Sequence, residues 1–279
     1  MQTVNLLNKQ ATSDFGQASL DRSIAAPSPG VAEHPQSLLE LPRGAARESL
    51  LAVHRVLATE LPASRLAIYE AGGGSTSFLP LDVLDRAHVT LVDIDEEQIR
   101  NNDYAHEAFL GDIQRHRFPT ASFDLITCYN VIEHLADVTS TLQHFCDALK
   151  PGGLLLIGAP NPQSLSGVVT RFSPHWFHVW FYRHVRGDRN AGRPGHAPFP
   201  TFFHRLVAPS KLERFVTALG LETIYRREFE SPRFPEMRAR KPMLAALLDS
   251  FAAALNFLLP ADSDVRRGDY HIILQKRAA

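Results

Sequence analysis

The sequence predicts an α/β fold built on a mostly parallel sheet, because short apolar runs alternate with segments of helical periodicity. The runs expected to form buried strands are 66–69, 89–92, 108–110, 123–128, 154–159, 221–225 and 270–274. Parallel strands need crossover connections, and the helical segments between these runs can supply them. We therefore expect helices on both faces of the sheet.

The first predicted strand of the sheet carries the most informative pattern. It runs into Glu70 and then into three consecutive glycines, Gly72, Gly73 and Gly74. Glycine lets the chain turn sharply and lets a ligand approach the backbone without a Cβ in the way. The next strand ends at Asp93, about 20 residues further on, where a nucleotide-binding βαβ unit places a carboxylate on a ribose diol. The pattern indicates a ribose-containing ligand, and a strand with a glycine turn and an unrelated surface Asp is the alternative at this point.

The helices follow from their start and stop signals. Pro80 falls where the first helix after the glycines would run, so that helix should start late or be short. After the second strand, Asp95 can cap a helix, and Gln98 three residues later completes a capping box. The other expected helices cover 50–61, 142–149, 209–219 and 243–259.

Composition limits the class of protein. The chain has 279 residues, 44% of them hydrophobic, which suffices for one sizeable core. A net charge of −1 gives no field that would favour nucleic acid. Cys128 and Cys146 show no paired spacing, as expected in a reducing compartment. The opening residues lack the pattern of a signal peptide, and no apolar run is long enough to span a bilayer. We expect a cytoplasmic protein.

A set of segments, in this order along the chain, resembles the landmarks of class I S-adenosylmethionine-dependent methyltransferases. The segments are IYEAGGGS, LVDID, GDI, FDLITCYNVIEHL, LKPGG, ALGLETI and YHIILQK. The closest likeness is to the small-molecule branch that includes ubiquinone-biosynthesis O-methyltransferases, and it covers about residues 46–160 and 204–276. The resemblance implies a Rossmann-like, doubly wound sheet of seven strands whose last strand is antiparallel.

The resemblance also implies the cofactor, S-adenosyl-L-methionine, and the residues that bind it. Glu70 would lie beneath the cofactor, and Asp93 would hold the ribose diol with both carboxylate oxygens. Asp112 would receive the adenine amino group, and ordinary turn chemistry is the alternative for it and for Asn130. The full set expected to bind the cofactor is Glu70, Gly72, Gly73, Gly74, Asp93, Ile94, Asp112, Ile113 and Asn130.

A nicotinamide oxidoreductase is the main structural rival. Its fingerprint is G-x-G-x-x-G, in which the last glycine packs the helix on the strand. Counted from Gly72, that last position holds Ser77, which disfavours the rival. The chain also departs from the methyltransferase pattern, because Thr76 stands where a further glycine is frequent. That departure affects the expected loop geometry more than cofactor binding.

Methyl transfer depends mostly on alignment, but a hydroxyl or amine acceptor can also require a general base. His134 is the first choice, because it follows the fourth strand at the edge where open α/β sheets bind ligands. Its neighbour Glu133 would orient it or approach the substrate. The alternative is that both only hydrogen-bond local backbone. The weaker candidates for the base are His175, His178 and His204. No acidic cluster accompanies the histidines at 175, 178 and 184, so we expect no metal.

The expected organisation is a flexible N-terminal segment, 1–44, and a single domain, 45–279. Two insertions interrupt the domain at 161–203 and 229–267. The first mixes arginines with aromatics such as Trp176 and Trp180, which suits a lid over the substrate or a membrane interface. A local core under a long loop is the alternative. The second contains the apolar helix 243–259, for which burial, dimerisation and contact with a bilayer all stay open.

Together these features predict S-adenosylmethionine-dependent methyl transfer to a small or lipid-like acceptor at a hydroxyl oxygen. Methyl transfer to nitrogen or carbon of a secondary metabolite or glycan is one alternative. A scaffold that keeps the fold and binds without turnover is another. We expect no nucleic-acid partner, and we leave peripheral membrane contact and a dimer open.

Overall fold

The computed structural model describes residues 22–24, 44–167, 175–184, 204–231, 233–258 and 264–278, with the single positions 173, 189 and 192. The described strands form one eight-stranded sheet in the order β1-β4-β3-β2-β5-β6-β8-β7. Their bounds are β1 Arg22–Ile24, β2 Leu66–Ala71, β3 Ala87–Asp93, β4 Glu107–Leu110, β5 Phe123–Tyr129, β6 Leu149–Pro160, β7 Leu221–Phe229 and β8 Asp269–Lys276.

The sheet has the mixed topology that the sequence predicts. Strands β4, β3, β2, β5 and β6 pair in parallel, and β8 runs antiparallel to both of its neighbours, β6 and β7. The expected doubly wound α/β class is therefore confirmed. The eighth strand, β1, was not expected, because it lies in the segment 1–44. It pairs antiparallel with β4 and so covers a sheet edge that would otherwise expose unpaired backbone groups.

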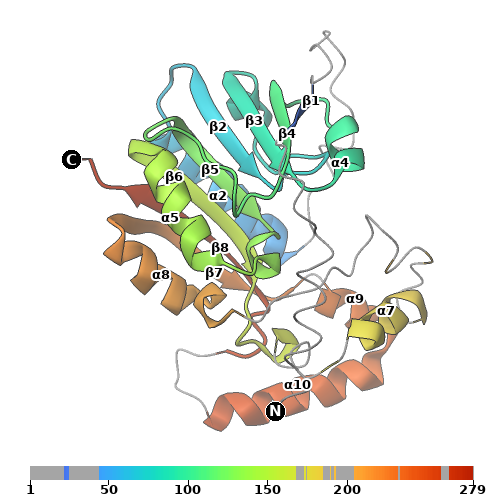
Figure 1. Ribbon diagram of the computed structural model, residues 1–279. Coiled ribbons are helices and arrows are strands. Elements are labelled where there is room, and N and C mark those ends of the chain that lie inside the picture. Colours follow the sequence, from blue (N-terminus) through green and yellow to red (C-terminus); the bar gives the residue numbers. More distant parts are fainter. Residues whose placement is uncertain are drawn as a thin grey trace, which may run out of the picture.

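Helices cover both faces of the sheet, as Figure 1 shows with α5 and α8 on one face and α2 on the other. The core accordingly has two parts, with Leu142 of α5 in one and Leu57 of α2 in the other. The helices are α2 Ala45–Glu60, α3 Leu81–Leu84, α4 Glu96–Arg100, α5 Val138–Ala148, α7 His175–His184, α8 Pro209–Ala218, α9 Arg233–Arg240 and α10 Pro242–Leu258, with the 3-10 turns η2 Ile132–His134 and η3 Arg205–Val207.

Local signals place the helices next to the glycine turn. Pro80 precedes α3, which is only 4 residues long, so the expected short helix is confirmed. The side chain of Asp95 caps α4 by accepting hydrogen bonds from the backbone N–H groups of Glu97 and Gln98. The second half of the expected capping box is absent, because the side-chain oxygen of Gln98 accepts instead from the N–H of Ser75 at 3.2 Å. Gln98 thus ties α4 to the glycine turn.

Three helices lie beyond the edge of the sheet where its parallel strands end. Figure 1 shows α7, α9 and α10 there, in yellow and orange. They belong to the two insertions expected from the sequence, and α9 packs on α10. None of the helices that the structure describes is both long enough and apolar enough to cross a membrane.

Candidate cofactor site

The candidate site lies where the strand order of the sheet reverses. Strand β2 pairs with β3 on one side and with β5 on the other, so the connections after β2 and β5 leave in opposite directions. Open α/β sheets bind ligands in the crevice at such a point, outside the carboxyl ends of the strands. A pocket opens here, and it is lined by Glu70, Ala71, Gly72, Gly73, Thr76, Phe78, Leu79, Thr127, Tyr129 and Leu156.

Two glycines of the turn after β2 leave no room for a side chain. Gly72 has a φ of +71°, and a Cβ there would come within 2.6 Å of the side chain of Val131. A Cβ on Gly73 would lie 2.9 Å from Oε2 of Glu70. The turn is therefore folded tightly against Glu70 and Val131, and both glycines line the pocket.

Glu70 is the buried acidic group of the pocket, with 2% of its surface exposed. Its carboxylate accepts a hydrogen bond from the hydroxyl of Ser77 and another from the hydroxyl of Tyr104, each at 2.5 Å. Burial raises the pKa of Glu70 to about 7, although both hydrogen bonds act in the opposite direction. Glu70 therefore titrates near neutral pH, and a cationic group beside it would stabilise its ionised form.

Asp93 joins the end of β3 to the glycine turn. One carboxylate oxygen accepts from the N–H of Gly74 at 3.0 Å, and the other from the N–H of Asp95 at 2.9 Å. Burial raises the pKa of Asp93, and these backbone hydrogen bonds lower it. The two bonds fix the orientation of the carboxylate at the carboxyl edge, and each oxygen keeps a lone pair for a further donor. Beside it, the side chain of Ile94 is 67% exposed and offers an apolar surface.

Asp112 and Ile113 follow β4, the next strand along the edge. The carboxylate of Asp112 accepts from the backbone N–H of Gln114 at 2.9 Å and from its side-chain amide at 3.1 and 3.2 Å. This is the turn chemistry considered from the sequence. Ile113 is only 4% exposed and packs in the core on the α5 face. The assignment of both residues to the adenine stays a prediction.

Asn130, Glu133 and His134 lie in the connection after β5. Asn130 is exposed and has a φ of +56°, a conformation that asparagine tolerates better than most residues. Glu133 is 8% exposed, and its Oε1 lies 3.8 Å from Nε2 of His134. The structure thus brings these two side chains together. Neither of them lines the pocket that contains Glu70.

Sequence reasoning missed the aromatic wall of the pocket. The rings of Phe78 and Tyr129 stack with their centroids 4.1 Å apart. Behind them, the hydroxyl of Tyr129 lies 2.6 Å from Nε2 of His271, and Nδ1 of His271 lies 2.8 Å from the hydroxyl of Ser49. Burial lowers the pKa of His271 to about 4, so the imidazole is neutral at pH 7. No local signal links Ser49 to His271, which are 222 residues apart.

Several expected positions fall outside the described residues or carry no site. Side-chain placement of His175 and His178 lies outside the described residues, and His204 precedes η3. Within the described ranges, no three His, Cys, Asp or Glu side chains lie close enough together to hold a metal ion. Trp176 and Trp180 of α7 are 69% and 47% exposed, and the side chains of Phe177, Phe181 and Tyr182 lie outside the described residues, so a lid and a local core both stay predictions for this segment.

A family model described as a methyltransferase domain matches residues 44–224. The chain therefore belongs to this methyltransferase-domain family. Its membership confirms the class expected from the sequence, the S-adenosylmethionine-dependent methyltransferases, and with it the expected cofactor. The residues around the pocket fit that cofactor, because they combine a backbone open to close approach with carboxylates for an ammonium group and for ribose hydroxyls.

Two curated relatives and one solved structure show how far the likeness extends. The demethylmenaquinone methyltransferase of Deinococcus radiodurans is 34% identical over 122 residues, which are 42% of this chain and 47% of the relative. The ubiquinone biosynthesis O-methyltransferase of Maricaulis maris is 28% identical over 180 residues, 60% of this chain and 63% of the relative. The chain thus spans about half of the first relative and less than two thirds of the second. A SAM-dependent methyltransferase from Archaeoglobus fulgidus is 18% identical, with a TM-score of 0.48 over 82% of this chain and 94% of that one.

Proposed function

We propose that the chain transfers a methyl group from S-adenosyl-L-methionine to a hydroxyl oxygen of a small, lipid-like acceptor. The observation that carries the proposal is the buried carboxylate of Glu70 under the glycine turn, which is linked through Gly74 to Asp93 at the end of the neighbouring strand. This arrangement supplies two carboxylates at the switch point of the sheet, where one can face a cationic amino acid end and the other a ribose diol.

In this proposal each cofactor-binding residue has a defined task. Ionised Glu70 attracts the ammonium group beneath the glycine turn, and the backbone of Gly72, Gly73 and Gly74 lies along the amino acid portion. Asp93 accepts hydrogen bonds from the ribose hydroxyls, and Ile94 and Ile113 provide apolar contact for the adenine ring. The remaining polar contacts come from Asp112 at the adenine amino group and Asn130 at the amino acid end.

Support for an apolar acceptor comes from the pocket and from the relatives. The stacked rings of Phe78 and Tyr129 form one wall, and Leu79 and Leu156 also line the pocket. The names of the curated relatives point to menaquinone and ubiquinone precursors as acceptors for those proteins. An acceptor with a hydroxyl on an apolar ring would combine both features. Such an acceptor would be met at a membrane surface, so the proposal includes peripheral contact with a membrane.

The bound cofactor would supply an activated methyl group, and the chain would supply alignment and proton removal. We assign the base to His134. The carboxylate of Glu133, 3.8 Å from the imidazole, would stabilise the protonated ring after it takes the acceptor's proton. Glu133 and His134 do not line the pocket with Glu70, so in this proposal only the hydroxyl end of the acceptor reaches them, while its apolar part meets the wall of Phe78 and Tyr129.

The proposal is tested by two measurements on the purified chain. Calorimetry with S-adenosylmethionine tests the cofactor. Transfer of a labelled methyl group to matched acceptors, a catechol, a quinol and an aromatic amine of similar size, tests the acceptor atom. We expect cofactor binding and labelling of the hydroxyl compounds. Labelling of the amine alone would contradict methylation at oxygen, and binding without transfer to any acceptor would favour a scaffold.

A further inference from the structure

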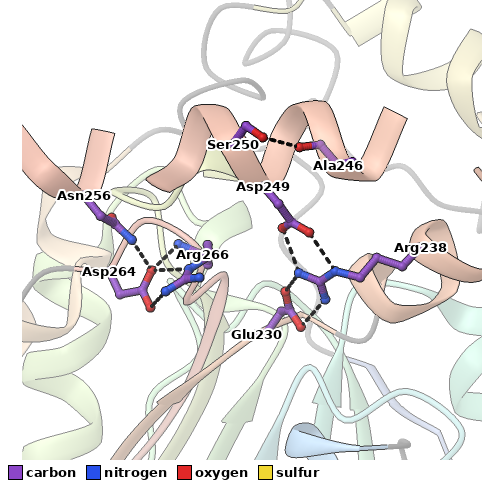
Figure 2. A network of polar contacts seen from close by, with 8 residues as sticks. All are labelled: Glu230, Arg238, Ala246, Asp249, Ser250, Asn256, Asp264 and Arg266. Atoms are coloured by element: carbon purple, nitrogen blue, oxygen red, sulfur yellow. Dashed lines mark hydrogen bonds and ion pairs between the residues drawn. The ribbon is translucent and has the colours of Figure 1, made fainter. Parts of the chain in front are cut away.

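Helix α10 turns Asp249 and Asn256 toward the protein and exposes several large apolar side chains to solvent. Figure 2 shows Asp249 pointing from α10 toward Arg238 of α9 and Glu230. Arg238 makes two hydrogen bonds to Asp249, at 3.0 and 2.8 Å, and two to Glu230, at 2.8 and 2.7 Å. This double fork connects α10, α9 and the residue that follows β7. It fixes which side of α10 faces the protein.

A second polar anchor, Asn256, lies about two helical turns further along the same side of α10. The side-chain amide of Asn256 donates to Asp264 at 2.7 Å, and its carbonyl oxygen accepts from the N–H of Val265 at 2.9 Å. Asp249 and Asn256 are seven residues apart, so they lie on one stripe of the helix. Ala245 and Ala252, which are 3% and 1% exposed, complete this inward side.

The opposite side of α10 is apolar and exposed. Met243, Leu247 and Phe251, spaced four residues apart, are 87%, 66% and 52% exposed, and Leu244 and Phe257 are 42% and 90% exposed. The hydroxyl of Ser250 on this side donates to the backbone carbonyl of Ala246 at 2.8 Å, as drawn in Figure 2. Its donor is therefore satisfied within the helix. We call the five side chains Met243, Leu244, Leu247, Phe251 and Phe257 the α10 face.

A face of this kind lowers the stability of the fold in water, because its apolar side chains stay in contact with water. A helix normally turns such a side to the core. Here the polar anchors on Asp249 and Asn256 hold it in the reverse orientation. Large exposed apolar faces mark sites at which a protein meets a partner or a membrane. The partner must be apolar where it meets the α10 face.

The basic residues next to α10 indicate the kind of partner that the α10 face meets. Arg240 and Lys241 are exposed just before the helix. Arg266 and Arg267, in the segment that follows it, are also exposed, but both pair with Asp264, at 3.0 and 3.9 Å. Cations before a helix N-terminus are unfavourable for the helix dipole, so Arg240 and Lys241 do not stabilise α10, although Arg240 lies in the last turn of α9, where a cation is favourable. Between residues 231 and 258, four Arg or Lys oppose two acidic residues, and one of the two, Asp249, already pairs with Arg238. Basic residues around an apolar helix face match an anionic lipid surface.

We propose that the α10 face docks on the surface of an anionic lipid bilayer, with the helix lying in the plane of the interface. The inference rests on the proposed function for its lipid-like acceptor, but the docking itself needs no methyl transfer. The helix does not cross the bilayer. Its apolar side chains enter the acyl boundary, while Arg240 and Lys241 meet the headgroups. Because α10 lies beyond the carboxyl edge of the sheet (Figure 1), docking brings that edge toward the membrane.

The test is flotation of the full chain with vesicles that contain phosphatidylglycerol and with vesicles of phosphatidylcholine alone. We expect binding to the anionic vesicles that falls as salt rises. The double variant Leu247→Glu/Phe251→Glu should lower the bound-to-free ratio at least about tenfold, because it places charge in the acyl boundary. The variant Arg240→Glu/Lys241→Glu should lower it about as much on anionic vesicles only.

Matched controls separate docking from misfolding and from loss of function. Leu51→Glu changes an exposed leucine on α2, 39% exposed, and Arg65→Glu reverses an exposed charge before β2. Both should bind vesicles as the wild type does. Affinity for S-adenosylmethionine, measured on every variant, should stay unchanged; it reports the proposed function separately, because a failure of cofactor binding would leave vesicle binding intact.

Three results would overturn the proposal. The first is failure of the wild type to float with anionic vesicles, and the second is binding of the α10 variants that equals binding of the controls. The third is a change of state: if light scattering shows that Leu247→Glu/Phe251→Glu turns a dimer into a monomer and vesicles bind neither form, the α10 face is an interface between two copies of the chain.

Discussion

The hydroxyl of Tyr104 donates a hydrogen bond to the buried carboxylate of Glu70 at 2.5 Å, across 34 residues of sequence. Tyr104 lies between α4 and β4, so the bond links the segment before β4 to Glu70 in the pocket. Burial raises the pKa of Tyr104 well above its usual value, which keeps the phenol protonated as a donor. The pocket therefore supports a carboxylate that can be charged although it is buried.

The first prediction concerns the pH dependence of folding. The pKa of Glu70 is about 7 in the folded chain against 4.5 for the free group, so the folded state keeps the proton more firmly. Stability due to this group is present below about pH 4.5 and is lost as the pH rises through about 7. Relative to Glu70→Gln, the wild type should lose up to about 3 kcal/mol of unfolding free energy across that window.

Urea unfolding of the wild type and of Glu70→Gln, at pH 5 and pH 8, measures this difference. His271 acts in the opposite sense, since its pKa is lowered to about 4 and stability due to it rises with pH between about 4 and 6.5. Both proteins contain His271, so its effect cancels in the comparison. Parallel pH profiles of the two proteins would show that Glu70 has an ordinary pKa.

The second prediction concerns the hydrogen bond from Tyr104. Because this bond lowers the pKa of Glu70, Tyr104→Phe should raise that pKa further. The pH at which cofactor affinity reaches half of its plateau should then move upward, since the ammonium group favours the ionised carboxylate. Isothermal titration calorimetry over a pH series measures the midpoint, and Tyr225→Phe, remote from Glu70, is the control. A midpoint equal to that of the wild type would mean that Glu70 ionisation does not govern binding.

The third prediction concerns the assigned base. His134→Ala should lower turnover about 10²–10⁴-fold on a hydroxyl acceptor, the range for a lost general base. Cofactor affinity should hardly change, because His134 does not line the pocket with Glu70. His144→Ala, at a histidine on α5, is the control. A loss below about tenfold would assign the deprotonation to another group or show that alignment suffices.

The fourth prediction concerns the first insertion as a cover for the acceptor. Replacing both Trp176 and Trp180 with alanine should raise the Michaelis constant for the acceptor and leave cofactor affinity intact. The melting temperature should change little, because the two side chains are 69% and 47% exposed. Steady-state kinetics and a thermal melt test this. Unaltered kinetics would remove these tryptophans from the acceptor site.

Seven of the eight described strands could be predicted, because each is a short apolar run with a clear stop. The cap of α4 by Asp95 was also readable, since it depends on residues that are adjacent in sequence. The orientation of Gln98 was not. Its side-chain oxygen accepts a hydrogen bond from the N–H of Ser75, a partner 23 residues away that the local sequence pattern does not reveal. The same limit hid strand β1, whose three residues carry no periodicity of their own.

In the candidate site too, residues close in sequence were predicted, and contacts between residues distant in sequence were missed. The glycines and Asp93 were predicted from their pattern and spacing, and Glu70 from the resemblance to the methyltransferase family. The structure brings them together at one edge. The support for Glu70 was missed, because Ser77 was considered only as a departure from a glycine pattern and Tyr104 not at all. The chain Tyr129–His271–Ser49 was missed for another reason, since it joins three separate elements that only the folded sheet brings together.

The most direct test of the central claim, that this edge of the sheet binds S-adenosylmethionine, is calorimetric titration of the wild type and of Asp93→Ala. Asp93 is held by two backbone N–H groups in the position assigned to the ribose diol. Asp147→Ala, which removes an exposed carboxylate from α5, is the matched control. We predict that the wild type and the control bind equally, and that Asp93→Ala loses about 1.5–3 kcal/mol of binding free energy, as expected for a lost charge-assisted hydrogen bond. Equal affinity of all three proteins would contradict the assignment of the site.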